Sequence, residues 1–147
     1  MAGIVCAIRG GPSSQPTIEK AIEIALDAGL SVYFLYVVNL DFLSRSASSR
    51  IHVIQEELEN LGDFILLSAK GQADAQGVAA QGIVRHGSVT QEIISLCQQI
   101  DANYVVLGRP QRQREGNVFD ELRLKEFISR LEQQSGAQVV FPERGMD

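Results

Sequence analysis

Three arginines follow an apolar run that ends in a glycine, in the last third of the sequence. Tyr104 to Leu107 is short and apolar, with two adjacent valines, which is typical of a strand that is buried on both faces of a sheet. Gly108 ends this run, and Arg109, Arg112 and Arg114 follow it in a polar segment. Ligands of open α/β sheets bind just outside the carboxyl ends of the strands. These guanidinium groups are therefore candidates for holding an anion.

The same charges have a simpler interpretation. Charged loops are usually solvated segments that keep an exposed edge soluble. Arg9, at the end of the first expected strand, and Lys125, in the last expected helix, would strengthen the case for an anion site if they faced the same crevice. We favour the solvated loop, and the anion site is the alternative.

Catalytic and metal-binding groups are sparse. His86 stands where a helix is expected to begin, so it is either part of an anion site or an ordinary surface residue of a turn. His52 is far from it in sequence, and no carboxylate lies at ligand spacing, so we predict no metal site. Cys6 and Cys97 are interpreted as buried thiols in a reducing cytoplasm. No Ser-His-Asp or paired-carboxylate arrangement is visible, so we assign no catalytic residue, and the sequence favours a protein without turnover.

Alternating strand and helix patterns must position these residues. Strands are expected at 4–8, 30–38, 78–85, 104–107 and 138–141, with a helix in each interval. Such alternation requires a parallel sheet that carries helices on both faces and is joined by right-handed crossovers. We predict one α/β domain over residues 1–147, a Rossmann-like doubly wound five-stranded parallel sheet. The weaker pattern of 78–85 places that strand near an edge.

Apolar periodicity and end signals predict the helix faces. Ser13 or Ser14 is expected to cap the first helix and Gly29 to end it, while Ser88 and Gln91 are expected to form a capping box on the third. The first helix should bury Ile18, Ala21, Ile22, Ala25 and Leu26. One face of the long second helix is expected to consist of Ile51, Ile54, Leu58, Leu61, Ile65 and Ser68. The end of this helix is expected to fray from Gly71 to Ala75.

Composition narrows the class of partner. The net charge of -5 argues against a general binder of nucleic acid or of anionic membranes. No apolar stretch is long enough to cross a bilayer, and no basic segment precedes the first apolar run as in a signal peptide. We expect a cytoplasmic protein with no nucleic-acid or membrane partner.

Four segments carry a resemblance to a known family. They are Ile4 to Ile8, the end of the second strand at Leu35-Tyr36-Val37, the segment from Ile83 to Ile94, and the run from Asp101 to Gly108. In this order and spacing the chain resembles the universal stress protein family. The resemblance implies a five-stranded sheet of order 3-2-1-4-5 and a protein that commonly forms dimers.

One branch of that family binds ATP, and the resemblance indicates where. Its members have an aspartate after the first strand and a glycine motif after the fourth, followed by a serine or threonine. Glycines at such positions let backbone N–H groups approach phosphate oxygens. In this chain the aspartate position is Arg9, the first glycine is kept as Gly108, and the second falls on Gln111. No Gly-Ser follows at the expected spacing, which reaches Glu121 and Leu122. We expect that the family's mode of phosphate binding does not carry over intact.

The resemblance also assigns candidate positions for binding a cofactor, ATP or AMP. Those on the adenine side are Ala7, Arg9 and Val37; those at the turn are Leu107 and Gly108, with Arg109 and Arg112 as phosphate partners. The leading hypothesis is a homodimeric, non-catalytic regulatory or stress-response module with at most weak binding of a nucleotide or anion. The alternative is an ATP- or AMP-binding member with altered phosphate contacts and slow hydrolysis. The apolar edge Val139-Val140-Phe141 is the expected dimer contact.

Overall fold

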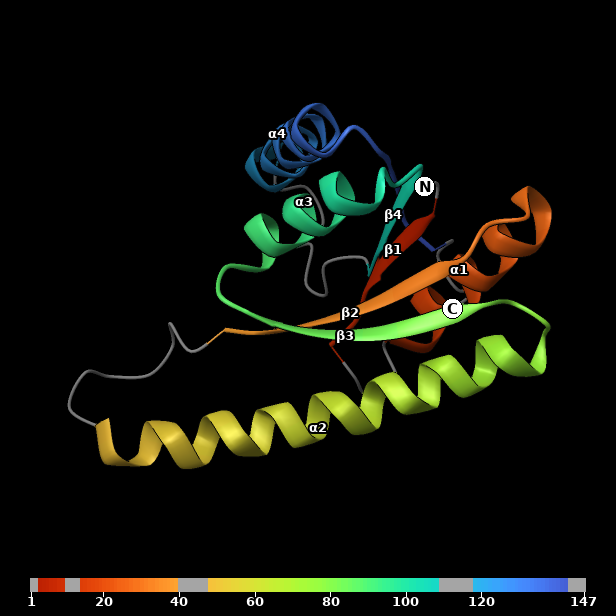
Figure 1. Ribbon diagram of the computed structural model, residues 1–147. Helices are drawn as coiled ribbons and strands as arrows, with labels where there is room; N and C mark the ends of the chain where they lie inside the picture. Colours follow the sequence, from red (N-terminus) through yellow and green to blue (C-terminus); the bar gives the residue numbers. More distant parts are fainter. Residues whose placement is uncertain (1–2, 10–13, 40–47, 109–117, 143–147) are drawn as a thin grey trace.

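The computed structural model describes residues 3–9, 14–39, 48–108 and 118–142, without the side chains of 48–52 and 118–121. Strands and helices alternate along these residues (Figure 1). The elements are β1 (Ile4–Ala7), α1 (Gln15–Ala28), β2 (Val32–Val38), α2 (Ser48–Ala75), β3 (Ala80–His86), α3 (Val89–Ile100), β4 (Tyr104–Leu107), α4 (Val118–Ser135) and β5 (Gln138–Val140). None of the helices in this part of the chain is long and apolar enough to span a membrane.

The strands form one parallel sheet in the order β3-β2-β1-β4-β5, which confirms the predicted fold class and strand order. The central strand β1 pairs with β2 on one side and with β4 on the other, so Ala7 stands opposite both Leu35 and Leu107. β3 lies at one edge, as predicted, and β5 at the other. The order in which the chain adds strands reverses at β1, which is where ligands bind in sheets of this kind.

Two apolar cores lie on opposite faces of the sheet. Helices α1 and α2 cover one face, where Ile4, Cys6 and Phe34 are buried. Helices α3 and α4 cover the other face, where Val5 and Leu35 are buried. Successive side chains of a strand point to opposite faces, so each central strand contributes to both cores. This two-sided burial explains why the strands are apolar along their whole length.

The predicted helix ends are correct in position but not in all their contacts. Gly29 adopts a left-handed conformation (φ 67°) and ends α1, as predicted. Ser14 and Ser88 occupy the N-cap positions of α1 and α3, but neither side chain makes a cap hydrogen bond. Instead the Ser14 hydroxyl accepts the backbone N–H of Arg9 (3.4 Å). β3 also runs one residue further than expected and includes His86.

The predicted buried faces of α1 and α2 are partly wrong. Leu26 is 52% exposed, and Leu61 and Ser68 point to solvent. The fully buried residues of α2 are Gly62, Leu66, Ala69 and Ala73, and three of these four are small. A Cβ on Gly62 would overlap the ring of Tyr36, and one on Gly82 of β3 would lie 2.9 Å from Leu66 Cβ. Because α2 lies this close to β2 and β3, small residues face the sheet. The same packing keeps Gly71 to Ala75 helical where fraying was expected.

Candidate functional site

Three half-buried apolar side chains lie at the carboxyl ends of adjacent strands. Ala7 and Leu107 are register partners at the ends of β1 and β4, and Val37 lies two residues beyond Leu35 on β2. All three pack against the core under α3 and α4, so they share one face of the sheet. They form a small apolar floor at the point where the strand order reverses. A flat, apolar group such as a nucleobase is the kind of ligand that this floor suits.

Gly108 follows directly after β4 and is exposed. An added Cβ at this position would lie 3.2 Å from the hydroxyl oxygen of Thr17, so a larger residue would require Thr17 to shift. The glycine therefore lets the end of β4 approach the first turn of α1 closely.

Thr17 is the polar group that the sequence interpretation missed. Its side chain is 2% exposed, and its hydroxyl has no hydrogen-bond partner among the described residues. The only sequence sign was its position in the first turn of α1, inside a stripe of apolar residues. A buried hydroxyl without a partner lowers stability, by about 1–3 kcal/mol in typical cases.

We expect Thr17→Val to raise the free energy of unfolding by about 1 kcal/mol, because valine keeps the shape and removes the unpartnered hydroxyl. Chemical denaturation of the purified protein measures this difference. Thr17→Ser, which keeps the hydroxyl and loses a methyl group, is the control and is expected to destabilise the protein. A loss of stability in Thr17→Val would show that the hydroxyl has a partner in solution.

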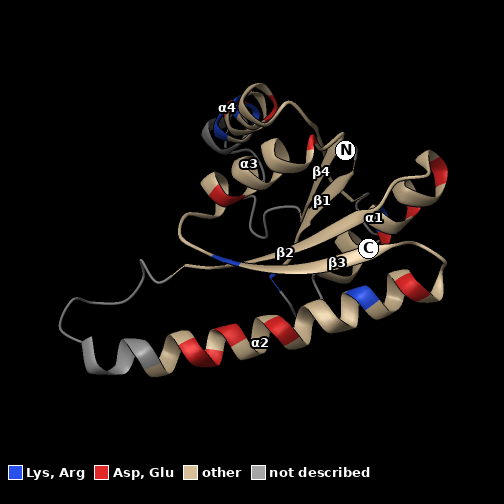
Figure 2. Cartoon of the chain, viewed as in Figure 1, with Lys and Arg blue, Asp and Glu red and all other residues tan. Residues whose placement is uncertain are grey.

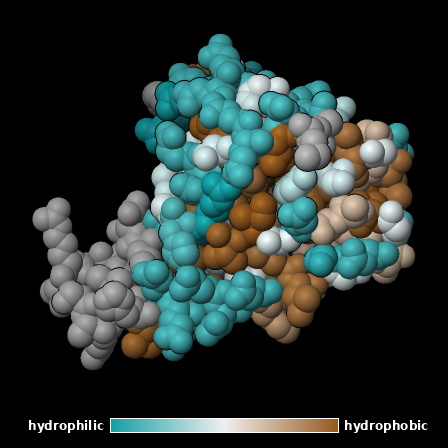
Figure 3. All heavy atoms as spheres, in the orientation of Figure 1, coloured by the Kyte–Doolittle hydropathy of each residue, from teal (hydrophilic) through white to brown (hydrophobic). Residues whose placement is uncertain are grey.

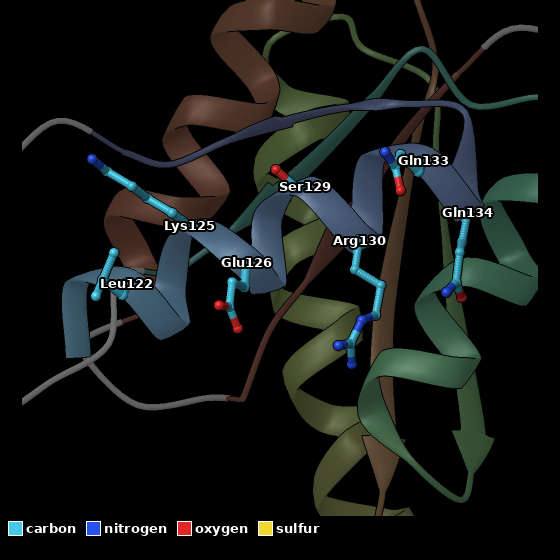
Figure 4. A pocket seen from close by; sticks show the side chains of 7 residues that line it. All are labelled: Leu122, Lys125, Glu126, Ser129, Arg130, Gln133 and Gln134. Atoms are coloured by element: carbon cyan, nitrogen blue, oxygen red, sulfur yellow. The ribbon is translucent and has the colours of Figure 1, made fainter. Parts of the chain in front are cut away.

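Of the cationic candidates, the structure describes only Arg9 and Lys125. Arg9 is exposed just beyond β1. Arg109 and Arg112, together with Arg114, lie outside the described residues, so their role as phosphate partners stays a prediction. Lys125 lines a shallow groove along α4 with Glu126, Ser129 and Arg130 (Figure 4). Its expected place at the crevice also stays a prediction.

His86 has a definite partner. Its Nε2 lies 2.9 Å from Glu59 Oε2, so the end of β3 is joined to α2 by a side-chain contact that is partly open to solvent. Arg85 Nη2 donates to Gln99 Oε1 (2.6 Å), and Arg85 Nη1 lies 3.7 Å from Glu92 Oε1. These two contacts join β3 to α3. These contacts anchor the edge strand to a helix on each side. They favour the interpretation of His86 as a structural surface residue.

The two thiols are buried, as predicted, and burial raises the pKa of both, for Cys97 to about 12. Thiolates are the reactive form of cysteine, so neither thiol is a nucleophile near neutral pH. Cys6 Sγ instead points at the carbonyl oxygen of Thr17 (3.8 Å). Within the described ranges, no group of three or more histidine, cysteine or acidic side chains is arranged to hold a metal ion.

A doubly wound parallel sheet with an apolar floor at its reversal point defines a class of α/β proteins that bind ligands at the carboxyl edge. Residues 2–120 match the universal stress protein family, and the chain belongs to that family. No curated protein sequence matches the chain significantly.

Solved structures of universal stress proteins share the fold at low sequence identity. UspA from Lactobacillus plantarum is 12% identical, with 97% of each chain covered and a TM-score of 0.76. The protein from Archaeoglobus fulgidus in complex with dAMP is 14% identical, with 97% of this chain and 98% of that chain covered and a TM-score of 0.62. A family protein from Arabidopsis thaliana with AMP bound is 14% identical, with 100% of this chain and 94% of that chain covered and a TM-score of 0.62.

Proposed function

We propose that this chain is a non-catalytic regulatory module of the cytoplasmic stress response that binds an adenine nucleotide weakly at the carboxyl ends of β1, β2 and β4. The observation that carries the proposal is the apolar floor of Ala7, Val37 and Leu107, beside the exposed turn at Gly108. Two structural neighbours hold AMP and dAMP, which supports an adenine nucleotide as the ligand.

Weak binding follows from what the sequence lacks. An adenine that buries about 150 Å² of apolar surface gains roughly 4 kcal/mol. The loss of translational and rotational freedom on binding costs at least about 4 kcal/mol, so the base alone leaves little net affinity. Phosphate contacts must supply the rest, and Gln111 stands where the family's second glycine would be. We therefore propose that the phosphates are held loosely, by guanidinium groups rather than by a series of backbone amides.

The second candidate is a protein that binds ATP or AMP more firmly through altered phosphate contacts and hydrolyses ATP slowly. The dAMP and AMP complexes of the two structural neighbours support nucleotide binding in this candidate, and hydrolysis stays a prediction. Arg9 would then replace an acidic side chain at the end of β1 and attract the phosphates directly.

Calorimetry with adenosine, AMP and ATP, with and without Mg²⁺, tests the proposal. We expect dissociation constants of about 1 mM for AMP and ATP, equivalent to roughly 4 kcal/mol of binding free energy. Charge reversal of Arg109 and Arg112, the expected phosphate partners, should weaken the binding of AMP but leave the binding of adenosine unchanged. Lys70→Glu is the matched control, because Lys70 is an exposed cation near the end of α2, away from β1. ATP binding in the micromolar range would reject the first candidate in favour of the second.

We also propose that the chain forms a homodimer through β5. Val139, Val140 and Phe141 are only partly buried at this edge of the sheet. An exposed apolar edge strand pairs readily with a second copy, and a twofold axis makes such pairing self-complementary. Light scattering should therefore give a mass near twice the 16.1 kDa of one chain.

A further inference from the structure

Helix α2 is apolar on two opposite faces. Its inner face, with Gly62, Leu66 and Ala69, is buried against β2 and β3. At 3.6 residues per turn, Phe64 lies on the opposite side of the helix, and it is 69% exposed. A helix that covers one side of a sheet normally has polar residues on its outer face. The outer face of α2 does not follow this pattern.

The exposed apolar side chains of α2 lie along one side of the helix, with polar residues between them. Val53, Leu61, Phe64 and Leu67 are four of the seven large apolar side chains that the described residues leave exposed. We call these four residues, with the exposed carboxylates Glu56, Glu57 and Asp63 beside them, the outer α2 surface. In Figure 3 brown side chains interrupt the teal ones along the α2 side of the molecule. A cluster of this kind marks an interaction site more often than scattered exposed residues do.

The charge of α2 indicates the chemistry of the partner. From Ser48 to Ala75 the helix carries five carboxylates against one arginine and one lysine, a net charge of -3 in a chain whose total is -5 (Figure 2). Two copies of this surface would repel each other. Anionic lipid and nucleic acid would be repelled in the same way. The negative charge of this surface therefore favours a partner that carries positive charge.

We propose that the outer α2 surface is a docking site for an amphipathic helix of a partner protein that carries apolar side chains flanked by lysine or arginine. Val53 and Leu67 are fourteen residues apart, which is about 21 Å along the helix axis. A partner helix of about four turns matches this length. Phe64 and Leu67 contact its apolar residues towards one end of this span, and Glu56, Glu57 and Asp63 contact its cations. Such helix recognition combines a few apolar anchors with a charged rim.

Synthetic peptides test this surface before any natural partner is identified. The probes are a fluorescent 18-residue amphipathic helix of leucine and lysine, its leucine and glutamate counterpart, and a leucine and lysine peptide of the same composition with a scrambled pattern. Fluorescence anisotropy should show binding of the first peptide only, with an affinity that falls as salt is added.

Variants locate the binding. Phe64→Ser combined with Leu67→Ser should weaken binding of the amphipathic cationic peptide by about 10-fold or more, the effect expected when two large apolar anchors are removed. Leu26→Ser and Leu122→Ser remove exposed leucines on α1 and α4 and should leave binding unchanged. Because all four side chains are exposed, circular dichroism melting should show every variant folded.

Three outcomes would overturn the proposal. The scrambled cationic peptide could bind equally well, which would show that binding depends on the net charge of the peptide and not on its amphipathic pattern. The double variant could bind the amphipathic peptide as tightly as the original protein does. Light scattering could instead show that the double variant abolishes self-association, which would assign the surface to a second copy of this chain.

Discussion

Gly62→Ala is expected to lower the free energy of unfolding by about 1–3 kcal/mol, the range for overpacking a buried site. Alanine is the better helix former by about 1 kcal/mol, so helix propensity alone predicts a gain. The added methyl group would overlap the buried ring of Tyr36, near the ring carbon next to its attachment point, which has no room to move away. Packing therefore outweighs propensity at this position. Denaturant unfolding of the variant measures the change.

Gly71→Ala is the matched control in the same helix. Nothing lies within 4 Å of a Cβ at Gly71, so the free energy of unfolding of this variant should rise by about 0.5–1 kcal/mol. A lower free energy of unfolding for Gly62→Ala and a higher one for Gly71→Ala would show that α2 packs closely against the sheet at Gly62. A gain at Gly62 equal to that at Gly71 would contradict the close packing of α2 on Tyr36.

Glu132→Ala is expected to strengthen the dimer. Gln138 N–H bonds to Asn103 beside β4, so the next N–H, that of Val139, points to the open edge of β5. The carboxylate of Glu132 accepts that N–H at 2.9 Å and thereby blocks the edge in the monomer. Pairing with a second copy must break this bond in both chains. Breaking this hydrogen bond costs about 1 kcal/mol in each of the two chains. A variant without the bond avoids that cost, so its dimer should have a dissociation constant about 30-fold lower.

Analytical ultracentrifugation over a concentration series measures this constant. Glu126→Ala, which removes an exposed carboxylate from the same helix, should leave it unchanged. If Glu132→Ala had no effect on a dimer that does form, β5 would not be the contact strand.

Most of the fold was predictable from the sequence because the strands are buried on both faces. Tyr104 to Leu107 and Val32 to Val38 are apolar in almost every position, and glycines end several of the helices between strands. These patterns determine a parallel α/β sheet with little ambiguity. The order of the strands came from the family resemblance, and the structure confirms it.

The inner face of α2 was not predictable in the same way. Sequence patterns follow large apolar side chains, and these led to Leu61 rather than Gly62. The close approach of the helix to Tyr36 and of Gly82 to Leu66 is a tertiary property that selects small residues. The apolar residues left over on α2, Phe64 and Leu67, are those that we propose to bind a partner.

The candidate site was predictable in part. Ala7, Val37 and Leu107 do share one face at the carboxyl edge, as strand order and alternation require. Thr17 was missed because a threonine in an apolar stripe gives no indication that its hydroxyl lacks a partner. Arg109 and Arg112 lie outside the described residues, so their contribution to phosphate binding stays a prediction.

The most direct test of the binding account is an amide NMR titration with AMP, because it reports the affinity and the location together. We predict shifts at Ala7, Val37 and Gly108 that saturate with a dissociation constant of about 1 mM. Shifts confined to other parts of the protein, or saturation below about 10 µM, would contradict the proposed weak site at the carboxyl ends of β1, β2 and β4.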